Sequence, residues 1–122
     1  MEAVARAEHN RAYYLRNKSK WVVYGETARA RPGYKARHNR NQAALRRRLR
    51  DKVNDIKLSS GCSDCGYNAH PQALHFDHVS GIKLSEVGAL VANKAKWSVI
   101  LQEITKCVVR CANCHAVKSW KP

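Results

Sequence analysis

Apolar and polar residues in the first part of the chain predict two helices separated by a turn. Residues 2–20 are rich in alanine, arginine, glutamate and tyrosine and contain no proline or glycine, which favours a helix. Residues 21–34 contain Gly25 and the pair Pro32 and Gly33, and these residues predict a break. A second helix is expected to follow this break.

The second helix is predicted for residues 35–57, because its apolar residues recur at spacings near four. The apolar stripe is narrow and the positions around it are basic, so one face can pack while the others carry positive charge. The stripe consists of Ala44, Leu45, Leu49, Val53 and Ile56.

The pattern changes near Ser59, where short apolar stretches alternate with turn residues and with clustered cysteines and histidines. Alternating apolar and polar residues predict a short strand over 74–79, and helical spacing predicts a helix over 97–106. We therefore expect an α+β protein with two parts. A basic helical extension covers residues 1–58, and a small metal-braced domain covers residues 59–122.

The net charge of the chain indicates what kind of partner it binds. The chain has 23 lysines and arginines against 9 acidic residues, a net charge of +14, and residues 1–58 hold most of the excess. A charge so far from neutral favours a polyanionic partner. No apolar run reaches the length of a membrane span and no secretory signal is evident, so a cytoplasmic protein without a membrane partner is expected.

Two CxxC pairs predict a structural zinc site. Cys62 and Cys65 form one pair and Cys111 and Cys114 the other, and this spacing lets two thiolates of one tight turn reach a tetrahedral Zn²⁺. The alternative is a set of ordinary buried thiols or a redox pair. Cys107 lies outside both pairs and is expected to be a small buried apolar residue.

Polar residues between and after the cysteine pairs suggest a second, catalytic centre. Asp77 and His78 are adjacent in the predicted strand, so they point to opposite faces, and a site explains such a pair better than packing does. Asp77 is a hard oxygen ligand suited to Mg²⁺ or Mn²⁺, and the pKa of histidine lies closest to neutral. Zinc at Cys114 would fix the adjacent His115, with Lys118 one turn later facing a phosphate.

The segments CSDCG, LHFDHV, EITKC and CANCHAVK resemble the zinc-stabilised, phage-associated HNH endonucleases, over residues 61–120. The resemblance implies the ββα-metal fold, in which a β-hairpin and a helix clasp a catalytic ion. It implies Asp77 and His115 as ligands of the catalytic Mg²⁺ or Mn²⁺ and His78 as the general base. The ligands of the structural zinc are then Cys62, Cys65, Cys111 and Cys114.

One position departs from the family pattern. Many members have the middle asparagine several residues before the second CxxC, where this chain has Lys106 and Cys107. Asn113 lies inside the second CxxC instead, and two interpretations of it stay open: it ties the hairpin loop to the helix, or it caps the final helix. His75 is expected to orient a neighbour or to pack against the hairpin.

The resemblance implies hydrolysis of phosphodiester bonds in double-stranded DNA, by nicking or double-strand cleavage. His78 would remove a proton from the attacking water, and the products would carry 5′-phosphate and 3′-hydroxyl ends. Many relatives are encoded beside phage packaging genes, so a phage terminase is a hypothetical partner and the host-cell cytoplasm the expected location of a phage-encoded protein.

The basic extension is expected to grip DNA phosphates without reading sequence. A merely solvated charged helix is the alternative interpretation. The residues predicted to contact DNA are Arg37, Arg40, Arg46, Arg47, Arg48, Arg50 and Lys118.

Three other functions compete with a nuclease. A non-catalytic four-cysteine zinc module that binds DNA would need the cysteines and the basic helix, but not the Asp and His residues together. A basic packaging protein with a degenerate HNH module is the second. A zinc deaminase is disfavoured, because its HxE and PCxxC signatures are absent: Asp77 stands two positions after His75, and Arg110 precedes the second CxxC.

Overall fold

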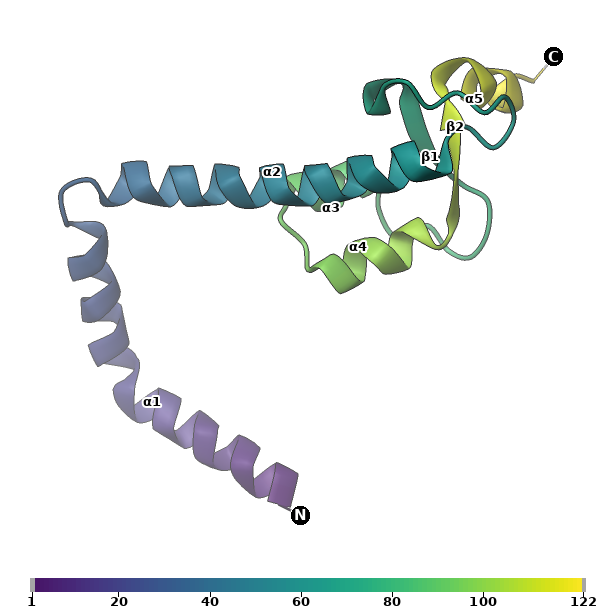
Figure 1. The fold of residues 1–122 in the computed structure, drawn as a ribbon. Coiled ribbons are helices and arrows are strands. Elements are labelled where there is room, and N and C mark those ends of the chain that lie inside the picture. Colours follow the sequence, from purple (N-terminus) through teal and green to yellow (C-terminus); the bar gives the residue numbers. More distant parts are fainter. Residues whose placement is uncertain (1, 122) are drawn as a thin grey trace. The chain divides into compact units, whose positions relative to one another are not determined.

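The computed structural model describes residues 2–121 and is drawn in Figure 1. The chain is mostly helical with one two-stranded antiparallel sheet, so its class is α+β. Its contacts divide it between Asn41 and Gln42, into an N-terminal unit (2–41) and a C-terminal unit (42–121). The elements are α1 (Glu2–Arg29), α2 (Tyr34–Ser60), η1 (Pro71–Ala73), β1 (Leu74–His78), α3 (Val87–Ala92), α4 (Trp97–Ile104), β2 (Cys107–Cys111) and α5 (Ala112–Ser119).

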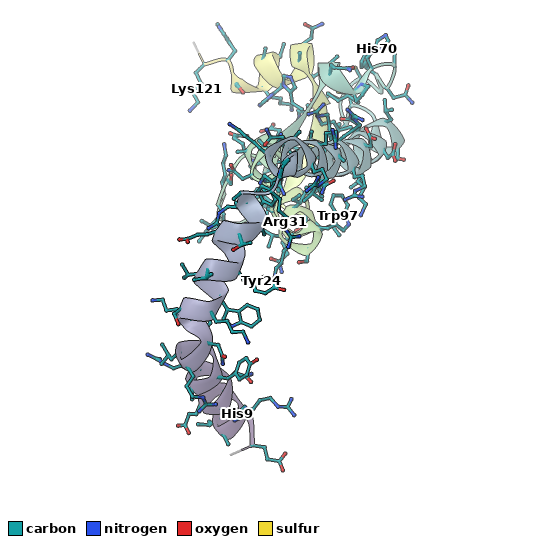
Figure 2. All side chains as sticks on the ribbon, turned by 90° about the vertical axis from the view of Figure 1, so that its left-hand side faces the viewer. His9, Tyr24, Arg31, His70, Trp97 and Lys121 are labelled. Atoms are coloured by element: carbon teal, nitrogen blue, oxygen red, sulfur yellow. The ribbon has the colours of Figure 1, made fainter. Side chains whose placement is uncertain are left out.

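The first predicted helix is confirmed and is longer than expected. α1 runs through Gly25 as far as Arg29, and the break is confined to residues 30–33, where Gly33 adopts a φ of 79°. Good helix formers around Gly25 outweigh its cost, which is about 1 kcal/mol relative to alanine. α1 buries none of its residues, and side chains such as His9 and Tyr24 project from it (Figure 2).

The apolar stripe of α2 forms one side of the main core of the C-terminal unit. Leu49 and Val53 are buried there, in contact with Val87 and Val91 of α3 and Ile100 of α4. In Figure 1, α3 and α4 lie along the half of α2 that leads to the sheet. Leu45, Leu49 and Val53 thus pack as their spacing predicts, whereas Ala44 is exposed and Ile56 is half-buried outside this core.

A glycine ends α2 directly before the first cysteine. Gly61 has a φ of 65°, a left-handed conformation that side-chain-bearing residues rarely adopt, and its N–H donates to the carbonyl of Lys57 at 2.8 Å. This is the usual way for a helix to satisfy one of its last carbonyls. The turn delivers Cys62 to the base of the sheet, where it is buried.

The two strands carry a second, smaller core. β1 pairs with β2 antiparallel, with Leu74 opposite Cys111 and His78 opposite Cys107. Leu74 is fully buried and packs with Val109 and with two of the cysteines. Helix α5 follows β2 directly and contacts both strands.

The predicted strand over 74–79 is confirmed as β1, whereas β2 was missed. We expected a helix over residues 97–106, but α4 ends at Ile104 and residues 107–111 are extended. Pairing with β1 outweighs the helical pattern there, because it satisfies backbone groups that a helix would otherwise use. The two strands do not form the expected hairpin with a short loop, because residues 79–106 between them contain α3 and α4.

The expected boundary near Ser59 lies at the end of α2, whereas contacts assign residues 42–60 to the C-terminal unit. The physical reason is that Leu49 and Val53 are buried in the core of that unit. The second half of α2 is therefore a structural part of the domain and not only a basic extension.

The core contact of Ile100 gives a first prediction. Ile100 is fully buried, so Ile100→Ala should lower the free energy of unfolding by about 2–5 kcal/mol. Val99 precedes it on α4 but is 42% exposed, so Val99→Ala should cost about 0.5 kcal/mol or less. Chemical denaturation of both variants with zinc in excess measures the difference, and equal costs would contradict this description of the core.

Candidate functional site

Four cysteines gather at the base of the sheet, as their spacing predicts. The sulfur atoms of Cys62, Cys65, Cys111 and Cys114 all lie within 4.8 Å of one another. The sulfurs of Cys65 and Cys111 are 3.7 Å apart. Four thiolates bound to a tetrahedral zinc at about 2.3 Å would lie about 3.8 Å from one another, so the cluster could hold such an ion.

Each CxxC pair forms a tight turn whose backbone N–H groups point at sulfur. The N–H of Cys65 donates to the sulfur of Cys62 at 3.5 Å, and that of Cys114 donates to the sulfur of Cys111 at 3.4 Å. Cys111 also caps the start of α5 with its sulfur. These donors favour thiolates, which are the form that binds metal.

The ionisation of the cluster favours a bound cation. Backbone N–H groups, above all that of Cys111, lower the pKa of the Cys62 thiol to about 6. Hydrogen bonding to the sulfurs of Cys111 and Cys62 raises the pKa of Cys114 to about 12. The four sulfurs cannot all be thiolates at such short range without a positive charge between them, and a divalent cation could supply that charge.

Cys107 is separate from the cluster, as its position in the sequence predicts. Its sulfur donates to the backbone carbonyl of Glu103 at 3.4 Å, and burial raises the pKa of its thiol to about 11. Cys107 therefore behaves as a partly buried, protonated side chain.

Asp77 and His115 meet on one face of the sheet. Oδ1 of Asp77 lies 3.7 Å from Nε2 of His115, which projects from α5 directly after Cys114. Two ligands that each bind a small divalent ion at about 2.1 Å lie at most about 4.2 Å apart, so this spacing fits a shared ion. The carboxylate of Asp77 suits Mg²⁺ or Mn²⁺, whereas the imidazole of His115 is a ligand more typical of transition metals such as Zn²⁺, Fe²⁺ or Ni²⁺.

His75 orients His115. Nδ1 of His75 and Nδ1 of His115 are 3.1 Å apart, and the two rings meet edge to face. This hydrogen bond leaves Nε2 of His115 directed at Asp77, as in metal sites where the second ring nitrogen of a ligand histidine is held by a neighbour. Of the two roles expected for His75, the structure favours orientation.

Arg110 holds the other oxygen of Asp77. It stands opposite His75 on β2, and its guanidinium bonds both Oδ2 of Asp77 and, at 2.9 Å, Oδ2 of Asp64 in the first cysteine turn. The arginine thus links the cysteine cluster to Asp77 and leaves Oδ1 free to face His115. The sequence offered no signal for this role, because the partners are separated by 46 and 33 positions.

His78 points away from this pair and bonds Glu103. As strand alternation predicts, His78 faces the opposite side of β1 from Asp77. Its Nε2 lies 2.9 Å from Oε1 of Glu103, and among residues 2–121 no hydrogen bond joins it to Asp77 or His115. His78 and His115 nevertheless both lie close enough to Glu86 to help lower its pKa, after the larger effect of its hydrogen bond with Lys83.

Glu103 is a buried carboxylate that sequence reasoning missed. It is 2% exposed and accepts hydrogen bonds from the backbone N–H groups of Leu84 at 3.0 Å and Ser85 at 3.5 Å. Lys106 donates to it at 2.8 Å, and this bond is the main cause that lowers the pKa of Glu103 to about 2. The carboxylate is therefore ionised throughout the physiological range and can only accept hydrogen bonds.

Lys106 ties down the segment that leaves β1. Its ammonium donates to the carbonyl of Ile82 at 2.7 Å, and its backbone carbonyl accepts from Val79 at 2.9 Å and Ser80 at 3.2 Å. We expected Asn113 to make such a tie or to cap the final helix. Capping by Asn113 is wrong, because α5 begins at Ala112 with Cys111 as its cap.

The predicted DNA-contacting residues lie on two elements. Lys118 is exposed on α5, one turn after His115. Arg37 and Arg40 are exposed on the part of α2 in the N-terminal unit. The remaining arginines lie on the part of α2 in the C-terminal unit, where Arg46 is half-buried and the others are exposed: Arg46, Arg47, Arg48 and Arg50.

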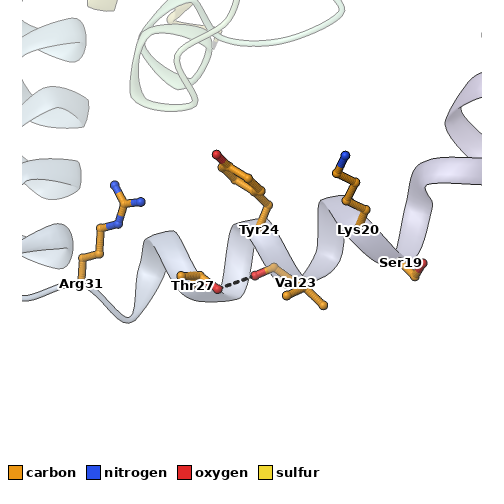
Figure 3. A pocket seen from close by; sticks show the side chains of 6 residues that line it. All are labelled: Ser19, Lys20, Val23, Tyr24, Thr27 and Arg31. Carbon is orange, nitrogen blue, oxygen red and sulfur yellow. Dashed lines mark hydrogen bonds between the residues drawn. The ribbon is translucent and has the colours of Figure 1, made fainter.

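A separate hollow of about 530 Å³ lies in the N-terminal unit along α1. Figure 3 shows the side chains of Lys20, Tyr24 and Arg31, which line it, projecting in the same direction from the backbone. It contains no histidine, cysteine or carboxylate, so it offers neither metal ligands nor an acid–base pair. Its lining residues are Ser19, Lys20, Val23, Tyr24, Thr27 and Arg31.

No family model, curated protein or solved structure matches this chain. Across residues 2–121, no helix is both long enough and apolar enough to span a membrane. The residues themselves must therefore carry any functional conclusion.

The cysteine cluster predicts metal content directly. Purified protein should contain one zinc ion per chain, and Cys111→Ser should lose it, because the variant removes one of four ligands. Cys107→Ser should keep it, since Cys107 lies outside the cluster. Elemental analysis after extensive dialysis measures both. Retention of stoichiometric zinc by Cys111→Ser, or its loss from Cys107→Ser alone, would contradict the assignment.

Proposed function

We propose that the chain is a divalent-metal-dependent DNA endonuclease of the HNH type, with β1, β2 and α5 as its ββα-metal unit. The observation that carries the proposal is the pairing of Asp77 Oδ1 with His115 Nε2 at 3.7 Å, beside a cluster that could hold a structural zinc. The second support is His78, a histidine held by a buried carboxylate at the end of the same strand.

The hydrogen bond to Glu103 selects the form of His78 that can act as a base. An ionised carboxylate only accepts, so Nε2 of His78 carries the proton in this contact. In the neutral ring the lone pair then resides on Nδ1. His78 can accept a proton from water through Nδ1 while Glu103 holds the ring in position, as a carboxylate does for the histidine of other hydrolytic sites.

Asp77 and His115 would hold Mg²⁺ or Mn²⁺, with Arg110 and His75 fixing their orientation. Bound there, such an ion would supply Lewis-acid stabilisation of charge that develops on the leaving oxygen. Lys118, one turn after His115, adds a cation on the same helix for a neighbouring phosphate. The products proposed are 5′-phosphate and 3′-hydroxyl ends.

The substrate proposed from the sequence resemblance is double-stranded DNA, and the positive charge of α2 supports a polyanionic partner. A phage terminase as a partner is proposed only from the sequence resemblance. Failure of a terminase to co-purify with the chain or to alter its cutting would remove that partner without affecting the nuclease.

Cleavage of supercoiled plasmid tests the proposal. Cutting should require added Mg²⁺ or Mn²⁺, and His78→Ala should lower its rate about 10²- to 10⁴-fold, because the general base is lost. His70→Ala is the matched control, since His70 is exposed and its side chain makes no capping hydrogen bond. Zinc content must be unchanged in both variants. DNA retardation without cutting under any divalent ion would favour the non-catalytic zinc module instead.

Glu103 gives a second test of the same site. Glu103→Gln keeps the size of the side chain but removes the obligate acceptor, so the turnover rate should fall about 10- to 100-fold while DNA affinity is unchanged. A merely structural role would lower zinc content or melting temperature in parallel with activity. The control is the exposed neighbour, Gln102→Ala, and an unaltered turnover rate in Glu103→Gln would remove Glu103 from the mechanism.

A further inference from the structure

Two adjoining hollows extend from the candidate catalytic face along α2. The first, of about 290 Å³, is lined by His75 and His115 together with Glu86 of the loop before α3. The second, of about 390 Å³, is lined by Arg46, Arg50 and Asn54 of α2. They share one set of wall residues, so they form a continuous depression, which we call the α2–α3 groove. The shared residues are Lys57, Phe76, Val87 and Gly88.

The α2 wall of this groove carries three cations, Arg46, Arg50 and Lys57, beside Val53 and Asn54. Arg46, Arg50, Asn54 and Lys57 are spaced by four, four and three residues, which places them on one helix face. Across residues 2–121, none of the ion pairs involves the three cations of this wall. At 1.5 Å per residue the wall from Arg46 to Lys57 is about 16 Å long, the length of about five nucleotides of a duplex strand.

Lys57 connects the two halves of the groove. Its ammonium lies 5.5 Å from the centre of the Phe76 ring, and burial lowers its pKa. A bound anion lowers the free-energy cost of burying a cation that has no carboxylate partner. The one carboxylate on the groove wall, Glu86, is already paired with Lys83.

Gly88 leaves the floor of the groove open. It lies in α3, and a Cβ added there would meet no atom within 4 Å. A larger side chain at this position would project into the groove without displacing the core. The position therefore allows the groove to be blocked without changing its charge.

We propose that the α2–α3 groove binds the sugar–phosphate backbone of one DNA strand next to the bond that is cut, with Arg46, Arg50 and Lys57 contacting phosphates within a stretch of about five nucleotides. The proposal rests on the proposed nuclease function, because His75 and His115 at one end of the groove mark where the cut phosphate lies. Charge complementarity and continuity with that face identify the occupant. Arg47 and Arg48 are also basic but do not line the groove.

A charge comparison tests the groove. Binding of a labelled DNA duplex is measured by fluorescence anisotropy at several salt concentrations, in the full chain carrying His78→Ala so that nothing is cut. Replacing Arg46 and Arg50 by alanine should weaken binding about tenfold or more and lower the salt slope by about two. Replacing Lys96 and Lys121 by alanine removes the same charge from exposed positions outside the groove and outside the predicted DNA contacts, and should change the affinity about threefold or less.

A steric comparison tests it without altering charge. Gly88→Leu should weaken DNA binding and, in the otherwise unaltered protein, slow plasmid cutting, with zinc content and melting temperature retained. Gly88→Ala, which adds one methyl group in open space, should bind as the parent does. Wild-type binding by Gly88→Leu, or equal effects of the two double alanine variants, would contradict DNA binding in the groove.

These outcomes separate the two proposals. If the parent binds DNA but cuts under no divalent ion, the nuclease fails while the binding comparison still decides the groove. If the parent cuts and the groove variants bind and cut normally, the groove alone fails. If the parent binds no DNA, the groove is overturned as well.

Discussion

The meeting of four cysteine sulfurs constrains the C-terminal unit more than any apolar contact does. Two of the four buried residues in the smaller core, Cys62 and Cys111, belong to this cluster, and only Leu74 and Val109 complete it. So little apolar surface seldom holds strands together without a further link. A cation shared by the sulfurs would supply that link, because the four cysteines bring the end of α2, the sheet and α5 together at one point.

The candidate catalytic geometry follows from this junction. Cys111 ends β2, caps α5 and pairs with Leu74, so it fixes the strand register and the start of the helix together. A slip of one residue would turn Asp77 and His78 to the opposite faces of β1. In the observed register, Asp77 lies near His115 on one face of β1, and His78 contacts Glu103 on the other face. The cysteine cluster therefore positions the candidate catalytic residues through the strand register, although no hydrogen bond joins the cysteines to Asp77, His78 or His115.

Local features of this chain were predictable and long-range ones were not. The helical stripe of α2, the strand β1 and the gathering of the CxxC pairs are each encoded within a few residues, and the structure confirms them. β2 was hidden because its apolar residues continue the spacing of α4, and α3 because a short apolar run carries no distinct period. The links made by Arg110 and Glu103 depend on tertiary contacts between distant segments, and no spacing in the sequence marks such contacts.

The position where the family resemblance led us to expect an asparagine shows how one role can be divided between two residues. An asparagine side chain both donates and accepts, and so can tie a loop from either side. Here Lys106 donates to the loop carbonyl of Ile82, while Glu103 accepts from the loop N–H groups of Leu84 and Ser85. The two side chains depend on each other, because a buried carboxylate without its cation is costly. A substitution of Lys106 would therefore alter the position of His78 through Glu103. The loop, α4 and the candidate base form a single coupled unit.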